Sequence, residues 1–152
     1  MSDIKGLQRC LDSFENKPFK NFAETALRSY GSQEKFDEAV KVINVITALY
    51  TKKKIIADNV NPYFFELMKT AALIHNLFFD GSWLSCFMAR NKLYDSAVSA
   101  GIQREHIEHI FTIVEGQLGV DMPVAGVRPN PNSPVDDFAL CCWIVKELLK
   151  DE

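Results

Sequence analysis

The chain has 152 residues and a mass of 17.2 kDa, with 47% apolar and 24% charged residues, which is typical of one globular domain. This composition excludes a disordered chain, a collagen-like chain and a disulfide-stapled miniprotein. Lys and Arg number 17 and Asp and Glu number 20, giving a net charge of -3. We therefore expect no broad electrostatic binding to nucleic acid or to anionic membranes.

The N-terminal region contains no uninterrupted apolar segment, and no apolar run approaches the ~20 residues that a membrane span requires. The four cysteines lack the paired spacing of zinc ligands or redox motifs, so we interpret them as reduced thiols, most of them buried. Both observations predict a cytoplasmic protein without a membrane anchor.

Helical periodicity begins near the N-terminus and continues almost without a break, and no segment shows the two-residue alternation of strands. We predict an all-α, single-domain bundle of about seven helices. Its first helix is marked by Ile4, Leu7, Leu11 and Phe14, and a second is expected over residues 18–30 with Tyr30 in its apolar stripe. Ser32 is the expected N-cap of a third helix, whose predicted buried stripe is Phe36, Ala39, Val40, Ile43, Ile46 and Leu49.

A strongly apolar helix is predicted over residues 62–79, and apolar residues on nearly all of its sides indicate a central, buried position. Two shorter helices are expected over residues 83–89 and 93–100, followed by one with an apolar stripe over residues 107–118. Ser133 and Pro134 begin the last helix. Its expected buried residues are Phe138, Leu140 or Cys141, Cys142, Ile144, Val145 and Leu148.

Residues 119–134 contain four prolines and predict a long ordered loop inside the domain rather than a linker. The apolar and basic residues of this loop are candidates for contact with a partner: Met122, Val124, Val127 and Arg128. We expect residues 1–31 to be a helical extension packed on the core and residues 32–152 to form that core, within one domain.

The three histidines are the first candidates for chemistry. His75 lies in the apolar stripe of the helix predicted over residues 62–79, so its ring is expected to face the core or a cleft at its edge. His106 and His109 have a spacing that can share a metal ion on one helix face. Their helical positions place His109 toward solvent and His106 at the boundary, so we interpret the pair as a polar helix edge.

A family resemblance is carried by the segment TAALIHNLFFDGSW, the segment REHIEHIFTIVEGQLG, the proline-rich loop and the segment SPVDDFALCCWIVKEL. Together they resemble the HD-domain superfamily of metal-dependent phosphohydrolases, over roughly residues 32–150. The resemblance implies an all-α bundle in which a histidine on an earlier helix, a His-Asp pair and an aspartate on the last helix hold a metal that activates water. The corresponding positions in this chain are Phe36, the pair His75 and Asn76, Glu115 for a further histidine, and Trp143 for the last aspartate.

These positions depart from the family at nearly every ligand, because Phe and Trp cannot bind a metal and Asn supplies only a neutral carbonyl. Losing two or three ligands should abolish catalytic affinity, since even changes around the ligands typically cost about 10–100-fold. We therefore predict a catalytically inactive HD-like domain with no bound metal and no cofactor. It would act by contact with a protein partner or with itself, as an assembly component or an inhibitor, and by analogy would suit a phage-encoded protein.

Two alternatives remain open. A nucleotide- or phosphate-binding module without hydrolysis would hydrogen-bond its ligand through His75 and Asn76 and neutralise phosphate through Arg90, Arg104 or Arg128. A phosphohydrolase with a rewired metal site would draw its ligands from His75, Asp80, Glu115, Asp136 and Asp137.

Overall fold

The computed structural model describes residues 4–52, 62–77 and 83–116, together with residues 142, 144, 145 and 147–149. These residues form helices joined by turns, with no strand among them, so the expected all-α bundle is confirmed. Within the same ranges, no helix combines the length and the apolar character needed to cross a bilayer.

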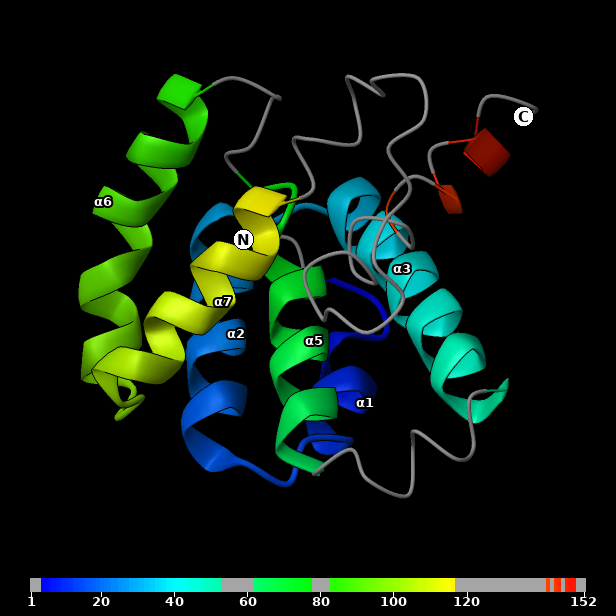
Figure 1. Ribbon diagram of the computed structural model, residues 1–152, viewed down its shortest axis with the longest axis horizontal. Helices are drawn as coiled ribbons and strands as arrows, with labels where there is room; N and C mark the ends of the chain where they lie inside the picture. Colours follow the sequence, from blue (N-terminus) through cyan, green and yellow to red (C-terminus); the bar gives the residue numbers. More distant parts are fainter. Residues whose placement is uncertain are drawn as a thin grey trace.

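Helix α5 (Pro62–Ile74) lies at the centre of the bundle (Figure 1). It contacts α2 (Lys17–Tyr30), α3 (Gln33–Lys52) and α7 (Arg104–Gly116). Helix α6 (Trp83–Ser99) lies at the edge and packs on α2 and α7, and the short α1 (Leu7–Asp12) contacts α2. The arrangement places sequence-distant helices around one central element.

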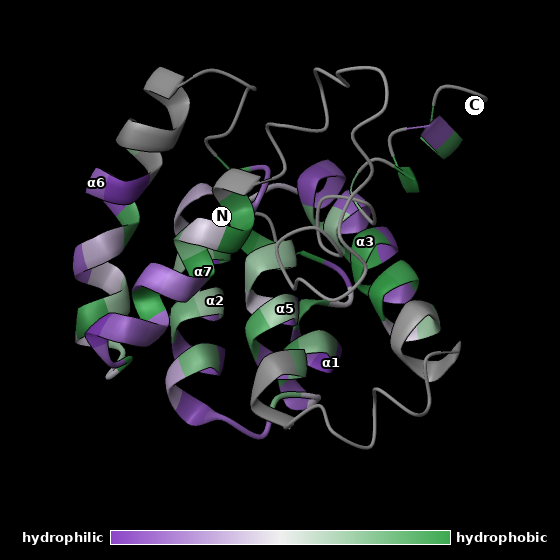
Figure 2. Ribbon diagram, in the orientation of Figure 1, coloured by the Kyte–Doolittle hydropathy of each residue, from purple (hydrophilic) through white to green (hydrophobic). Residues whose placement is uncertain are grey.

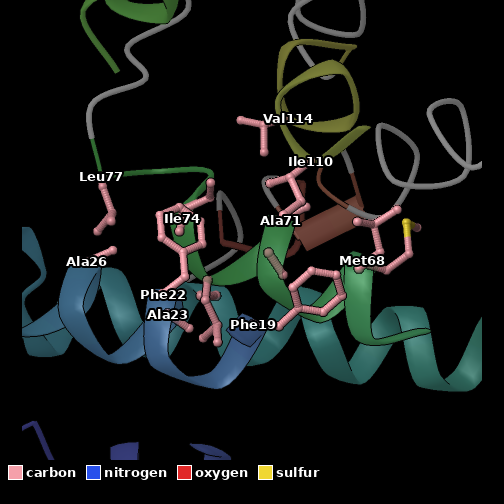
Figure 3. Close-up of a cluster of buried hydrophobic side chains, with 14 of the residues drawn as sticks. Phe19, Phe22, Ala23, Ala26, Met68, Ala71, Ile74, Leu77, Ile110 and Val114 are labelled. Carbon is pink, nitrogen blue, oxygen red and sulfur yellow. The ribbon is translucent and has the colours of Figure 1, made fainter. Parts of the chain in front are cut away.

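The core forms where three helices meet α5. Residues 67–74 of α5 are all buried, which confirms the predicted central position, and hydrophobic residues run along this helix (Figure 2). Phe19 and Phe22 of α2 lie on one side of Ala71 and Ile110 of α7 lies on the other (Figure 3). The small side chain of Ala71 leaves room for these larger groups, so α2, α5 and α7 bury a continuous apolar cluster.

Helix α2 follows its sequence pattern closely. Asn16 caps the N-terminus by accepting a hydrogen bond from the Phe19 backbone N–H at 3.1 Å, and Pro18 occupies the first turn. The predicted apolar stripe is buried, except that Tyr30 at the C-terminal end is 40% exposed. Tyr30 is the last residue of the helix, so the expectation of burial there is corrected.

Helix α3 begins as predicted, because Ser32 Oγ accepts a hydrogen bond from the Lys35 backbone N–H at 3.2 Å. Its buried stripe is rotated slightly from the predicted one. Val42 is buried, whereas Val40 and Ile43 are only half-buried against the core. Helix α3 packs on α5, and its fully buried residues among those whose burial the structure describes are Phe36, Ala39, Val42 and Ile46.

The central helix is shorter than predicted, because it ends at Ile74 and a turn over residues 75–77 follows. The Leu77 backbone N–H donates to the Ile74 carbonyl at 3.2 Å. Lys35 Nζ donates to the Leu77 carbonyl at 3.0 Å, so a side chain of α3 satisfies a backbone group beyond the helix end.

The expectation of two short helices over residues 83–89 and 93–100 is wrong, since α6 is continuous from Trp83 to Ser99. Arg90 lies inside this helix, where its guanidinium pairs with Glu108 of α7 at 3.0 Å and lies 5.1 Å from the Phe111 ring centroid. The contacts of Arg90 with α7 stabilise the middle of α6. The helix therefore continues through this segment although apolar residues are absent there.

Near the C-terminus, the described residues 142, 144, 145 and 147–149 are helical. Cys142 and Val145 are buried as predicted, and Ile144 is half-buried. Leu148 is 60% exposed, so its predicted burial is corrected. Leu148 lies three residues after Val145, and the partly buried neighbour Leu149 takes the position against the core instead.

Candidate functional site

Two segments far apart in the sequence meet where α3 begins and α5 ends, and we name this place the α3–α5 junction (residues 35–38 and 75–77). Asn76 Nδ2 donates to the Lys35 carbonyl at 2.9 Å and to Glu38 Oε2 at 3.1 Å. Lys35 in turn binds the backbone beyond α5. The structure therefore brings the His75–Asn76 pair beside the first turn of α3, which carries Phe36.

His75 is buried in this junction, with 3% of the residue exposed. Its Nδ1 lies 2.6 Å from the Ala72 carbonyl oxygen, one helical turn earlier. Because a carbonyl oxygen can only accept, Nδ1 carries the proton in this contact. The ring was expected to face the core or a cleft at its edge, and its burial agrees with the first of these.

Phe36 is also buried, with 3% exposure, and its ring faces the N-terminal segment. A Cβ atom placed on Gly6 would lie 3.4 Å from Phe36 Cε2, which shows how closely the ring approaches that backbone. Gly6 has a φ of 87° and stands at the N-terminus of α1. Phe36 therefore fills space between α3 and the segment that precedes α1.

The orientation of the Asn76 carboxamide is fixed by its neighbours. Both atoms that face Nδ2 are oxygen acceptors, so the amide group cannot be reversed without placing oxygen against oxygen. Its Oδ1 atom is buried without a hydrogen-bond partner. The junction thus suits an amide, whereas a carboxylate at this position would face a carbonyl and a second carboxylate.

The two candidate phosphate-binding arginines that the structure describes lie elsewhere. Arg90 joins α6 to α7 through Glu108 and the Phe111 ring. Arg104 is exposed at the first position of α7. Arg90 is thus engaged in a contact between helices, while Arg104 presents its charge to solvent.

His106 and His109 occupy the positions expected for a polar helix edge. His106 is half-buried and its ring packs edge-on against Phe19, with 6.2 Å between the ring centroids, whereas His109 is exposed. In the part of the chain that the structure describes, no group of three or more His, Cys, Asp or Glu residues is placed to hold a metal ion.

Several predicted site residues lie outside the described residues. Glu115 belongs to α7, and the structure describes only its place in the helix. The predicted interaction loop and the remaining carboxylates are not covered: Asp80, Met122, Val124, Val127, Arg128, Asp136, Asp137 and Trp143.

A buried ion pair on α5 is a polar feature that the sequence pattern did not predict. Lys69 Nζ lies 2.9 Å from Glu66 Oε2, with side chains that are 6% and 8% exposed, and the contact is electrostatic rather than an aligned hydrogen bond. Both residues also bind the connection between α1 and α2. A charged pair three residues apart in an otherwise apolar helix was the available signal.

Cys10 and Cys142 are free thiols, in agreement with the expectation for these two cysteines. Burial raises the pKa of the Cys10 thiol, and the positive charge of Lys69 lowers it by a smaller amount. The thiol is therefore protonated at neutral pH and is a poor nucleophile.

Comparisons of the chain with family models, with curated proteins and with solved structures gave no match.

Proposed function

We propose that the chain is a catalytically inactive HD-like helical domain that acts through contact with a protein partner or with a second copy of itself. The observation that carries the proposal is the use of the Asn76 carboxamide. It stands where the resemblance places a metal-binding aspartate, and it donates both hydrogens to α3, at the Lys35 carbonyl and at Glu38. A group engaged in this way joins two helices and supplies no negative charge to a metal ion.

Two neighbouring side chains support the same interpretation. Phe36 fills the space against Gly6, and the His75 ring is buried in the turn after α5, with its Nδ1 hydrogen-bonded to the Ala72 carbonyl of that helix. Burial of apolar surface stabilises a fold by about 25 cal/mol per Å². The described part of the junction therefore contributes packing energy where an active member of the family would need ligands.

The first test restores the acidic residue of the family motif by the substitution Asn76→Asp. The new carboxylate would lie where Nδ2 now contacts Glu38, so we expect the free energy of unfolding at pH 7 to fall by about 1–3 kcal/mol. Repulsion between the new carboxylate and Glu38 favours the protonated form of the pair in the folded variant, so this part of the loss should be complete at pH 7 and should disappear as the pH falls to about 4. Urea unfolding at pH 7 and at pH 3.5, with and without millimolar Mn²⁺ or Mg²⁺, measures this.

The matched control is Asn91→Asp on the exposed side of α6, which should change the unfolding free energy by no more than about 0.5 kcal/mol. Metal content of the purified wild-type protein and of Asn76→Asp is measured by plasma mass spectrometry alongside. Stoichiometric metal in either protein, or strong stabilisation of Asn76→Asp by the cations, would contradict the proposal and favour a rewired phosphohydrolase.

The second test addresses contact with another protein. Met88 and Val98 are large apolar residues of α6 that are 46% and 52% exposed, so they are accessible to a partner. We expect Met88→Glu with Val98→Glu to weaken capture of a stoichiometric partner, or self-association in light scattering, by at least about tenfold. Asn44→Glu, at an exposed position of the different helix α3, is the control. A protein that remains monomeric and captures nothing from its own cells would contradict an interaction role.

A further inference from the structure

The buried pair on α5 acts on one particular segment, residues 4–16, which we name the N-terminal strap. Glu66 Oε1 accepts hydrogen bonds from the backbone N–H groups of Glu15 and Asn16, the latter at 2.9 Å. Lys69 Nζ donates to the Ser13 carbonyl at 3.1 Å and lies 3.4 Å from Ser13 Oγ. Both charges of the pair are thus bound to the backbone between α1 and α2.

Aromatic rings close the remaining sides of the Lys69 ammonium group. It lies 4.5 Å from the Phe14 ring centroid and 5.2 Å from that of Phe65. Phe14 belongs to the strap and Phe65 to α5, so the cation is enclosed between the two elements. This enclosure exists only while the strap is docked.

The strap has little capacity to remain ordered by itself. Its helix α1 has only six residues, and isolated helices shorter than about 12–15 residues are marginal in water. Its order depends on docking Leu7, Leu11 and Phe14 into the core, on the bonds from the buried pair of α5, and on two exposed hydrogen bonds between Lys5 and Gln33. When the docked side chains leave the core, α1 loses the contacts that keep it helical. We therefore expect undocking of the strap and unfolding of α1 to occur in one step.

We propose that the strap is a conformational device that opens as a unit while the rest of the bundle stays folded, and that the Glu66–Lys69 pair is its latch. Burying two charges costs desolvation, and that cost is offset by their mutual attraction, by their contacts with the strap and by the contact of Lys69 with the Phe65 ring. Opening returns both groups to water. A change that unbalances the pair therefore penalises the docked strap specifically, whereas the contacts of α5 with α3 and α7 stay in place.

Hydrogen exchange of the full chain, followed by mass spectrometry, tests the proposal without any variant. In the wild-type protein, amides of residues 7–16 should exchange at least about tenfold faster than the protected amides of α5 and α7, because opening of the strap needs less free energy than global unfolding. Equal exchange rates in the strap and in these helices would overturn the proposal.

The variant Glu66→Gln then tests the latch. It keeps an oxygen acceptor for the Glu15 and Asn16 N–H groups but removes the negative charge beside Lys69. We expect exchange in residues 7–16 to accelerate at least about tenfold more than exchange in α5 and α7. Unchanged exchange in the strap, or equal acceleration in all three segments, would show that the pair is no latch.

The control is Glu24→Gln, which removes an exposed partner of Arg28 on α2 and should leave exchange in the strap unchanged. Alkylation of Cys10, resolved from that of buried Cys142 by peptide mass spectrometry, gives a second readout. Glu66→Gln should accelerate alkylation of Cys10 more than that of Cys142. Parallel acceleration of both thiols would indicate global unfolding and would overturn the proposal.

Discussion

Phe22→Ala is expected to lower the free energy of unfolding by about 3–5 kcal/mol, the usual range for removing a large aromatic side chain from a closed core. Phe22 is fully buried on α2, in the cluster that α2 forms with α5 and α7. Residues on three helices line the space around it, and they can collapse only partly into the cavity. Urea unfolding monitored by circular dichroism measures the loss.

Thr25→Ala is the matched control, because it lies on the exposed side of the same helix, three residues further along. We expect its effect to stay within about 0.5 kcal/mol. A loss of less than about 1 kcal/mol for Phe22→Ala would mean that α2 packs on α5 less closely than the structure has it.

Lys69→Met is the second substitution with a large expected effect, a loss of about 3 kcal/mol at pH 7. The variant leaves the Glu66 carboxylate buried with two backbone N–H donors and no cation. Methionine retains most of the apolar length of lysine, so lost packing between the Phe14 and Phe65 rings contributes little. If the strap undocks before the rest of the bundle unfolds, the loss of global stability cannot exceed the free energy that holds the strap in place.

The double variant Glu66→Gln with Lys69→Met separates the charge effect from the packing effect. Replacing a whole buried pair is often close to neutral, so the double variant should recover most of the loss seen in Lys69→Met. A double-mutant cycle from the four unfolding free energies measures this coupling. Losses that simply add would mean that the two side chains act independently.

Two kinds of helix could be predicted well from the sequence. In the first, apolar residues recur on one side, which is the buried side; in the second, apolar residues occupy nearly all sides and the helix is buried all round. The α2 stripe is of the first kind, and residues 66–74 of α5, all of them buried, are of the second. The break predicted within α6 failed for a specific reason. Arg90 has its partner Glu108 on another helix, 18 residues away, and local periodicity contains no information about that contact.

The candidate site could be predicted only in part. Burial of His75 followed from its place in an apolar stripe, and the exposure of His109 followed from its helical position. The role of Asn76 depends on how the end of α5 is aligned with the start of α3, which no local pattern specifies. The Glu66–Lys69 pair was visible as two charges in an apolar helix, but its targets, the backbone groups of residues 13–16, are set by the tertiary fold.

The central position of α5 has a consequence for synthesis on the ribosome. Helix α2 packs chiefly on α5 and α6, and α3 packs on α5, so both emerge from the exit tunnel before their partners exist. Until residues 62–74 have been translated, the apolar faces of α2 and α3 lack the surface of α5 on which they pack. The nascent chain is therefore most exposed to aggregation and to chaperone binding during its first half, and a pause in translation before α5 would lengthen that interval.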